Sequence, residues 1–163
     1  MEFKKMYIAG GCFWGLEDLM RTQKGVLDIT AGYAGGTTPN PTYEHHGDYA
    51  EAIEIVYDPS QTSFWNLLDF FFQIHNPTTR IQQGNDIGTS YRSAIFYQDE
   101  DEHKQAEDFI KIVNDSHRWP NPVVTTLEPF TNFYRAEEYH QDFLLKNPGG
   151  YTCHAIYFDS YLK

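Results

Sequence analysis

The apolar positions of this chain follow two different spacings, and their order along the sequence predicts a mixture of strands and helices. Alternation of apolar and polar residues is typical of a strand, whereas apolar residues three and four positions apart are typical of a helix. Ile53, Ile55 and Tyr57 follow the first spacing, and residues 64–72 follow the second. The predicted strands cover residues 5–9, 26–33, 50–57, 93–97 and 123–127, and the predicted helices cover about 12–22, 63–75, 99–116 and 136–145.

The order of these elements predicts an α+β fold. The series β-α-β-β-α-β-α-β-α is typical of a two-layer sandwich with a mainly antiparallel, mixed sheet and a ferredoxin-like (split βαβ) core. A doubly wound α/β fold is the main alternative. No repeat or linker interrupts the sequence, so we expect one domain over residues 1–163. The Pro-Gly-Gly of the segment from about 147 predicts a flexible C-terminal tail, whereas the aromatic-rich residues 155–162 are expected to pack on the body.

The segment around Cys12 is chemically unusual, because a cysteine lies between paired glycines and paired aromatic residues. It reads Ala9-Gly10-Gly11-Cys12-Phe13-Trp14-Gly15 and connects a predicted strand to a predicted helix. Glycine permits a sharp turn at such a point. The N-terminus of a helix favours an anion, and a thiolate in that setting is a reactive nucleophile. A buried cysteine that only fills core space is the alternative, but it leaves the glycines unexplained.

Glu51 is a candidate proton donor because of its place in the predicted strand 50–57. Side chains alternate between the two faces of a strand, so Glu51 shares a face with Ile53 and Ile55. If that face is the core face, burial raises the pKa of Glu51 and lets it donate a proton near neutral pH. A solvated glutamate at a strand end is the alternative, and the alternation alone does not decide between the two.

The composition narrows the class of protein. A net charge of −11 argues against general binding to nucleic acids or anionic membranes, and no apolar run approaches the roughly 18 residues of a membrane span. Aromatic residues make up 17% of the chain, which fits either a pocket lined by rings or an aromatic core. We expect a soluble, cytoplasmic monomer.

The cysteine and histidine patterns favour thiol chemistry over metal chemistry. The two cysteines are Cys12 and Cys153, and without a recognisable secretory segment a redox or catalytic use is favoured over a purely structural disulfide. No CxxC motif is present, and the seven histidines show no metal-ligand spacing. No metal site is therefore predicted.

The motif Gly-Cys-Phe-Trp-Gly resembles the signature of the peptide methionine sulfoxide reductase A family, which reduces the S epimer of methionine sulfoxide. The resemblance extends over nearly the whole chain. Further similar segments are Gly32–Gly36, Asn40–Tyr43, Ala50–Glu51, Val56–Pro59, Gln83–Gly88, Tyr91–Ser93, Glu138–Gln141 and Gly149–His154. One departure is that Asp48-Tyr49-Ala50-Glu51 replaces a Gly-His-Ala-Glu run after a shorter segment. This makes the alignment of Tyr43 less secure, and Tyr49 is the alternative for its role.

The resemblance implies a role for each candidate residue. Cys12 is the nucleophile, Phe13 and Trp14 hold the substrate methyl group, and Cys153 is the resolving thiol that forms a Cys12–Cys153 disulfide. Glu51, Tyr43 and Tyr91 contact the sulfoxide oxygen, and Asp86 organises the pocket. The implied substrates are methionine sulfoxide in proteins, in peptides or as the free amino acid. No bound cofactor is required, because thioredoxin, or dithiothreitol in vitro, regenerates the enzyme by thiol–disulfide exchange.

Two other functions remain open from the residues alone. A Cys-His hydrolase pairing Cys12 with His140 or another histidine needs an oriented His–acid pair and leaves Cys153 unused. A non-enzymatic module that binds apolar peptides would use the aromatic residues as anchors but gives no role to a thiol at a helix start. Titration of the thiols before and after addition of a sulfoxide separates the three, because only the reductase consumes both thiols.

Overall fold

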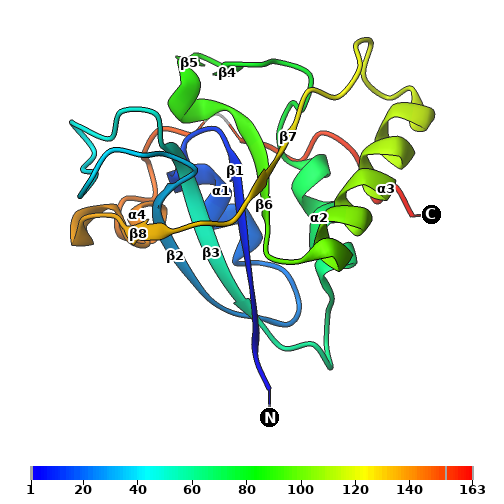
Figure 1. Cartoon of the computed structure of the whole chain (residues 1–163), viewed down its shortest axis with the longest axis horizontal. Coiled ribbons are helices and arrows are strands. Elements are labelled where there is room, and N and C mark those ends of the chain that lie inside the picture. The colour runs from blue at the N-terminus through cyan, green and yellow to red at the C-terminus, as the bar shows by residue number, and fades with distance from the viewer. Residues whose placement is uncertain (1, 153, 163) are drawn as a thin grey trace.

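A curled six-stranded sheet with helices packed on one face organises the molecule (Figure 1). The computed structural model describes residues 2–152 and 154–162, so the predictions for Cys153 lie outside the described residues. The elements in chain order are β1 (Lys4–Gly10), α1 (Phe13–Met20), β2 (Val26–Ala34), β3 (Ala50–Tyr57), α2 (Phe64–Gln73), β4 (Gln82–Gln83), β5 (Asp86–Ile87), η1 (Thr89–Tyr91), β6 (Ser93–Tyr97), α3 (Glu100–Ser116), β7 (Thr126–Pro129), β8 (Phe133–Arg135), η2 (Glu138–His140) and α4 (Phe143–Lys146).

The strand order confirms a mainly antiparallel, mixed sheet. The order is β7-β6-β1-β3-β2-β8, and the β6–β7 pair is parallel while the other neighbours are antiparallel. A doubly wound fold needs a mostly parallel sheet, so that alternative is wrong. Strand β3 lies between β1 and β2, and β1 lies between β3 and β6. The ferredoxin-like description of the core stays a prediction.

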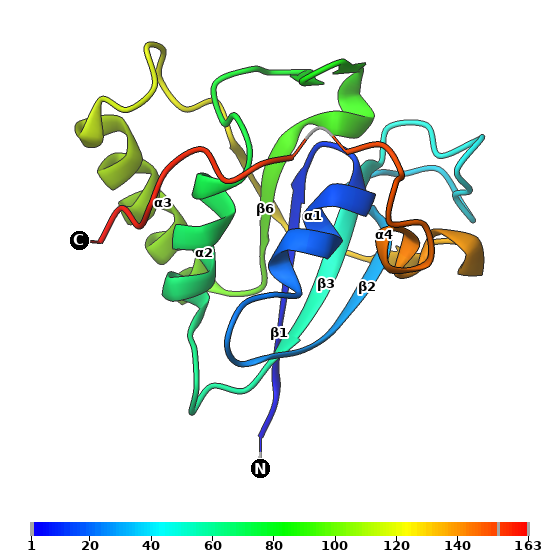
Figure 2. The same ribbon diagram turned by 180° about the vertical axis from the view of Figure 1, so that it is seen from behind.

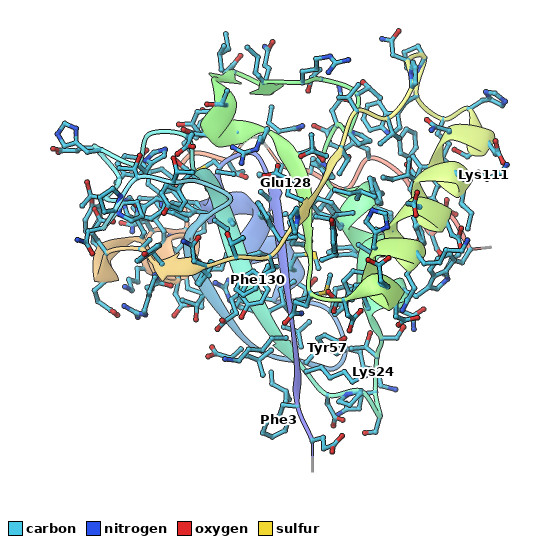
Figure 3. All side chains as sticks on the ribbon, viewed as in Figure 1. Phe3, Lys24, Tyr57, Lys111, Glu128 and Phe130 are labelled. Atoms are coloured by element: carbon cyan, nitrogen blue, oxygen red, sulfur yellow. The ribbon has the colours of Figure 1, made fainter. Side chains whose placement is uncertain are left out.

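The two faces of the sheet are covered differently. Seen from behind, α1 and α2 lie across one face (Figure 2), where Ile8 and Ile53 pack with the apolar stripes of the helices. The other face carries small residues such as Ala9 and Ala52. Phe130 lies over β1 on this face (Figure 3) and stacks on Tyr7, with ring centroids 4.1 Å apart. Small side chains let this covering segment approach the sheet closely. The larger cluster of buried apolar side chains, the main core, lies on the helical face.

The predicted helix 136–145 is wrong. The strand β8 (133–135) comes just before this segment. Within the segment, only the 3-10 turn η2 and the short α4 form. Asp142 has a φ of 53°, which breaks a continuous helix. The backbone N–H of Ala136 donates to the carbonyl of Ala31 at 2.9 Å, and the Gln141 side chain bonds both backbone groups of Ala31. Pairing with β2 therefore overrides the helical spacing of this segment.

The remaining elements differ from the predictions mainly at their ends. The predicted strand 123–127 lies later in the chain, because β7 spans Thr126–Pro129. Residues 76–90, to which the sequence pattern assigns neither a strand nor a helix, contain the small β4–β5 ladder, in which Gly84 adopts a φ of 56°. The strands 50–57 and 93–97 have the predicted bounds. In the part of the chain that the structure describes, no helix is long and apolar enough to cross a membrane.

The end of the chain packs on the body, as predicted for residues 155–162. The Tyr161 backbone N–H donates to Asp69 at 2.8 Å, and the Tyr157 backbone N–H donates to the carbonyl of Gln73 at 2.8 Å. Both partners belong to α2. The flexibility predicted from about residue 147 stays a prediction.

Candidate active site

Cys12 lies at the turn from β1 into α1, as predicted. It occupies the N-cap position of α1 and is 4% exposed. Gly11 adopts a φ of 96°, and a Cβ atom there would lie 2.7 Å from the Gln83 side chain. Only glycine combines this backbone conformation with so close a neighbour. The helix dipole and the first amides of α1 therefore favour a negative charge at the Cys12 sulfur.

Glu51 is buried beside this turn, so the solvated alternative is wrong. It is 1% exposed, and its Oε1 accepts a hydrogen bond from the Phe13 backbone N–H at 3.2 Å. Burial raises the pKa of Glu51 to about 8, and the charge of nearby Asp86 adds to the rise. Hydrogen bonds from the Phe13 amide and with Cys12 act in the opposite direction. Oε2 is buried and has no hydrogen-bond partner among the described residues. Glu51 is thus protonated at neutral pH and adjacent to the thiol.

Tyr43, Tyr91 and Asp86 converge on the same place from the loop before β3, from η1 and from β5. Burial, followed by the charges of Glu51, Cys12 and Asp86, raises the pKa of Tyr43 to about 12. Burial and these same groups, together with Tyr43, also raise the pKa of Tyr91. Both phenols therefore stay protonated and can donate hydrogen bonds. One Asp86 carboxylate oxygen is buried without a hydrogen-bond partner in the described part of the chain.

Tyr49, the alternative to Tyr43 in the sequence, lies elsewhere. Its buried ring packs edge-on against Tyr134, with centroids 5.9 Å apart. It also fills the space beside Gly36, where a Cβ atom would lie 2.4 Å from the tyrosine ring. Tyr43, in contrast, lies 6.3 Å from the Phe13 ring. The phenol near Cys12 and Glu51 is therefore that of Tyr43.

Phe13 and Trp14 form an aromatic wall next to Cys12. The Phe13 ring is fully buried and lies 5.2 Å from the imidazole of His140. The Trp14 ring stacks on Phe143, with centroids 3.8 Å apart and an interplanar angle of 9°. Its indole N–H donates to His140 Nδ1 at 3.0 Å. Apolar faces beside a thiol suit a small apolar group such as a methyl.

The segment around η2 supplies two residues that the sequence did not assign to the site, His140 and Glu137. His140 is fully buried, and burial lowers its pKa. Because Nδ1 accepts the hydrogen bond from the Trp14 indole, the proton of the neutral imidazole lies on Nε2. Glu137 accepts from the Tyr33 hydroxyl at 2.8 Å and from the Tyr43 backbone N–H at 3.0 Å. Burial acts to raise the pKa of Glu137, but these donors lower it overall. The available signal was the family-like block 138–141, which the helical spacing obscured.

The residues on either side of position 153 pack against the Cys12 turn. His154 Nε2 donates to the carbonyl of Gly10 at 2.6 Å. A Cβ atom on Gly15 would lie 2.3 Å from Thr152 Oγ1 and 2.4 Å from His154 Nδ1. The second glycine of the motif therefore makes room for the C-terminal segment. Cys153 itself lies outside the described residues.

The geometry of His140 does not support the Cys-His hydrolase alternative. Nδ1 of His140 is engaged by the indole of Trp14 and does not serve as a base for Cys12. Within residues 2–152 and 154–162, no group of three or more His, Cys, Asp or Glu side chains is arranged to hold a metal ion.

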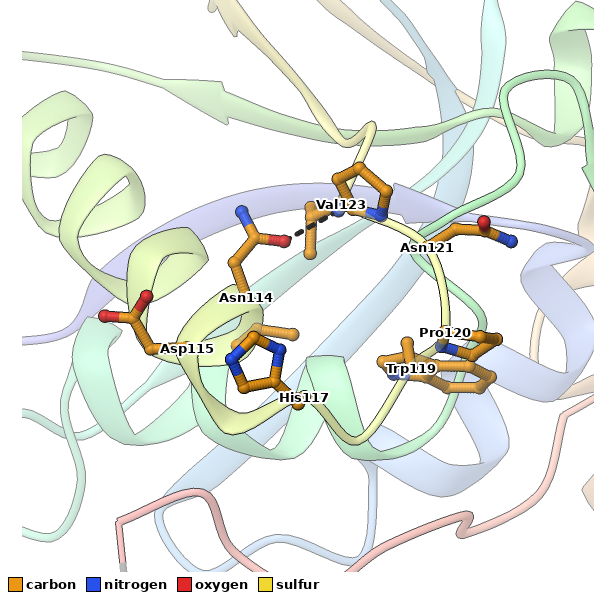
Figure 4. Close-up of a pocket in the computed structure, with 9 residues that line it drawn as sticks. Asn114, Asp115, His117, Trp119, Pro120, Asn121 and Val123 are labelled. Atoms are coloured by element: carbon orange, nitrogen blue, oxygen red, sulfur yellow. Dashed lines mark hydrogen bonds between the residues drawn. The ribbon is translucent and has the colours of Figure 1, made fainter.

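A separate cavity of about 320 Å³ lies between the C-terminal end of α3 and residues 117–123 (Figure 4). It is formed without any residue of the Cys12 cluster.

Comparison with known proteins finds relatives that match most of this chain. A curated relative from Nocardia farcinica, "Peptide methionine sulfoxide reductase MsrA", is 56% identical over 153 residues, which cover 94% of this chain and 90% of the relative. Reduced Mxr1 from Saccharomyces cerevisiae superposes with a TM-score of 0.84 at 36% identity, covering 95% of this chain and 92% of that one.

A second structure of the yeast protein includes another chain. Mxr1 in complex with Trx2 superposes with a TM-score of 0.62 at 28% identity, covering 95% of this chain and 90% of that one. The family model described as peptide methionine sulfoxide reductase matches residues 4–160. The chain therefore belongs to the peptide methionine sulfoxide reductase family.

Proposed function

We propose that this protein reduces the S epimer of methionine sulfoxide, free or within proteins, and that Cys12 is its nucleophile. The observation that carries the proposal is the pairing of a thiol at the N-cap position of α1 with a buried carboxyl group of raised pKa beside an aromatic wall. A soft nucleophile, a proton donor and an apolar slot are the three groups that reduction of a methyl sulfoxide requires.

In the first step, the Cys12 thiolate attacks the sulfoxide sulfur while Glu51 donates a proton to the oxygen. Oxygen then passes to Cys12, so one thiol and one sulfoxide become one sulfenic acid and one thioether. The substrate sulfur gains two electrons and the Cys12 sulfur loses two. The neutral phenols of Tyr43 and Tyr91 donate hydrogen bonds to the same oxygen, and Asp86 keeps the local charge that favours a protonated Glu51.

Phe13 and Trp14 hold the methyl group of the substrate. Their rings form the apolar wall beside the thiol, and the Phe143 and His140 contacts fix the plane of the Trp14 indole. Placing the methyl against this wall leaves one orientation in which the oxygen faces Glu51. Selection of one sulfoxide epimer follows from that geometry.

In the second step, the thiol of Cys153 condenses with the Cys12 sulfenic acid, which forms a disulfide and releases water. Support comes from the packing of Thr152 and His154 against Gly15, because one residue separates these two along the chain. An external dithiol then reduces the disulfide by exchange, so no bound organic cofactor is needed. The complex of the yeast relative with Trx2 favours thioredoxin as that dithiol, and dithiothreitol would replace it in vitro.

A coupled assay on separated R and S epimers of methionine sulfoxide tests the proposal. We expect thioredoxin-dependent turnover of the S epimer and loss of both thiols after one equivalent. Cys12→Ser should abolish methionine formation, whereas Cys153→Ser should form methionine once and then stop with Cys12 as a sulfenic acid. Equal turnover of both epimers, or turnover by Cys12→Ser, would contradict the proposal. Repeated thioredoxin-dependent turnover by Cys153→Ser would remove Cys153 from the mechanism.

A further inference from the structure

Glu17 is a buried carboxyl group to which the mechanism above gives no role. It lies on α1 one turn after Phe13 and is 0% exposed. Both carboxylate oxygens lack a hydrogen bond of regular geometry among the described residues. Buried carboxylates are ordinarily fully bonded, and an exception requires an explanation.

The groups that face Glu17 come from the start of α4 and from its own helix. Burial raises the pKa of Glu17 to about 7, and the Asp142 carboxylate acts in the same direction. The Asp142 backbone amide, Arg21 and the Phe143 amide act to lower the pKa. Arg21 Nη2 lies 3.7 Å from Glu17 Oε1 and 3.2 Å from Asp142 Oδ1. The carboxyl group thus faces the first amides of α4, with Arg21 bridging the two segments.

The segment that Glu17 faces also carries the contacts that orient Trp14. Phe143, the first residue of α4, stacks on the Trp14 indole at 3.8 Å, and His140 accepts from the indole N–H. Gln141 holds the same segment to β2 from the other side, through bonds of 2.9 Å to both backbone groups of Ala31. On the side of α1, the helix that bears Trp14 itself, Arg21 reaches both Asp142 and Glu17.

We propose that Glu17 is a positioning residue for the methyl pocket. Its carboxylate holds Arg21, which bridges α1 and the start of α4, so that Phe143 stays stacked on Trp14 and the indole keeps the plane that receives the substrate methyl group. The inference rests on the proposed function, in which Trp14 lines that pocket. Glu17 acts through Phe143 and does not touch the substrate.

The ionised form of Glu17 attracts the guanidinium of Arg21, which also contacts Asp142 before α4, and the protonated form attracts it less. The stack on Trp14 should therefore loosen as the pH falls through about 7. Arg21 on α1 and Asp142 before α4 are the charged groups that face Glu17 and shift its pKa. No other element contributes a charge to that shift among the described residues.

Glu17→Gln is the first test, because it keeps the shape of the side chain and removes its charge. We expect the KM for a methyl sulfoxide to rise about five- to twentyfold, which corresponds to about 1–2 kcal/mol, with kcat changed less than twofold. Asp18→Asn is the matched control. Asp18 lies on the same helix and pairs with Arg21 at 2.9 Å, but its side chain is 40% exposed. An equal KM effect in both variants would overturn the proposal.

A spectroscopic test follows Trp14 directly. In a Trp65→Phe/Trp119→Phe background, Trp14 is the only tryptophan, and its fluorescence should titrate with a midpoint of about 7. Glu17→Gln should abolish this titration, and Asp18→Asn should retain it. A titration that survives Glu17→Gln would overturn the proposal.

A double-mutant cycle guards against a general loss of structure. Phe143→Leu should raise KM as Glu17→Gln does, and the double variant should show little further effect, because both changes release the same contact. Additive effects would overturn the proposal. Failure of the proposed function would be distinct, since the unmodified protein would then not reduce methyl sulfoxides at all.

Discussion

At the scale of single residues, β3 shows how position decides the chemistry of a carboxyl group. Glu54 accepts a hydrogen bond from the Tyr7 hydroxyl at 2.8 Å and lies 3.8 Å from Lys5. Glu51, on the opposite face, has one bonded oxygen and one buried oxygen without a partner among the described residues. An acid needs a proton to give, and burial raises the pKa of Glu51 to about 8, so this carboxyl group can hold one at neutral pH.

The first prediction concerns Glu51→Gln, which preserves shape and removes the acidic proton. We expect the single-turnover rate of methionine formation to fall by about 10²–10⁴, the usual contribution of a general acid. Because the pKa of Glu51 is raised to about 8, the unmodified protein should hold its rate below that pH and lose it above. Rapid quench across this range measures both effects.

Glu54→Gln is the control for this prediction, since it changes the same strand without touching the Cys12 turn. Its single-turnover rate should remain close to that of the unmodified protein. A Glu51→Gln variant that reduced sulfoxide at an unchanged rate, with the same loss above about pH 8, would assign the proton to another donor.

At the scale of elements, the N-terminal turn of α1 is shaped by its contacts with a segment far along the chain. Alanine is a better helix former than glycine by about 1 kcal/mol, so helix propensity alone would favour alanine at position 15. The contact with Thr152 and His154 excludes it. Glycine is therefore present for packing between α1 and the C-terminal segment.

The second prediction follows from this contact. Gly15→Ala should push Thr152 and His154 away from the turn, slow formation of the Cys12–Cys153 disulfide about tenfold or more, and leave methionine formation in the first turnover within about threefold of normal. Trapping of the sulfenic acid against time measures the two steps separately. Gly149→Ala is the control, because nothing lies within 4 Å of a Cβ atom there. Equal disulfide rates in both variants would show that the packing at Gly15 does not matter for resolution.

Elements with one apolar face were predictable from the sequence, and elements held by distant backbone pairing were not. The alternation of Ile53 and Ile55 predicted the bounds of β3 and the face that carries Glu51, but the burial of Glu51 came from the structure. Residues 136–145 have helical spacing, yet Gln141 bonds Ala31, which lies 110 residues away in the chain. No local pattern encodes such a contact. For the same reason, the bond between Trp14 and His140, 126 residues apart, could not be read from spacing.

At the scale of the whole molecule, the net charge of −11 acts on substrates before they reach the thiol. The acidic groups extend to the rim of the site. Tyr139 is 57% exposed, and its ring lies 4.0 Å from that of His140. Burial is the largest cause that raises the pKa of Tyr139, and the charges of Glu137 and Glu44 raise it further. A substrate peptide therefore approaches through a negative field, which favours positive charge beside the oxidised methionine.

The last prediction is that peptides with lysine on both sides of methionine sulfoxide are reduced with a higher kcat/KM than the same peptides with glutamate. We expect about a three- to tenfold difference at low ionic strength, arising from faster association, and convergence of the two values at about 1 M salt, where the Debye length is about 3 Å. Free methionine sulfoxide, whose net charge is zero, serves as the control and should show little dependence on salt. A preference for the glutamate peptides, or a lysine preference that persists in high salt, would show that contacts within the site rather than the overall charge select the substrate.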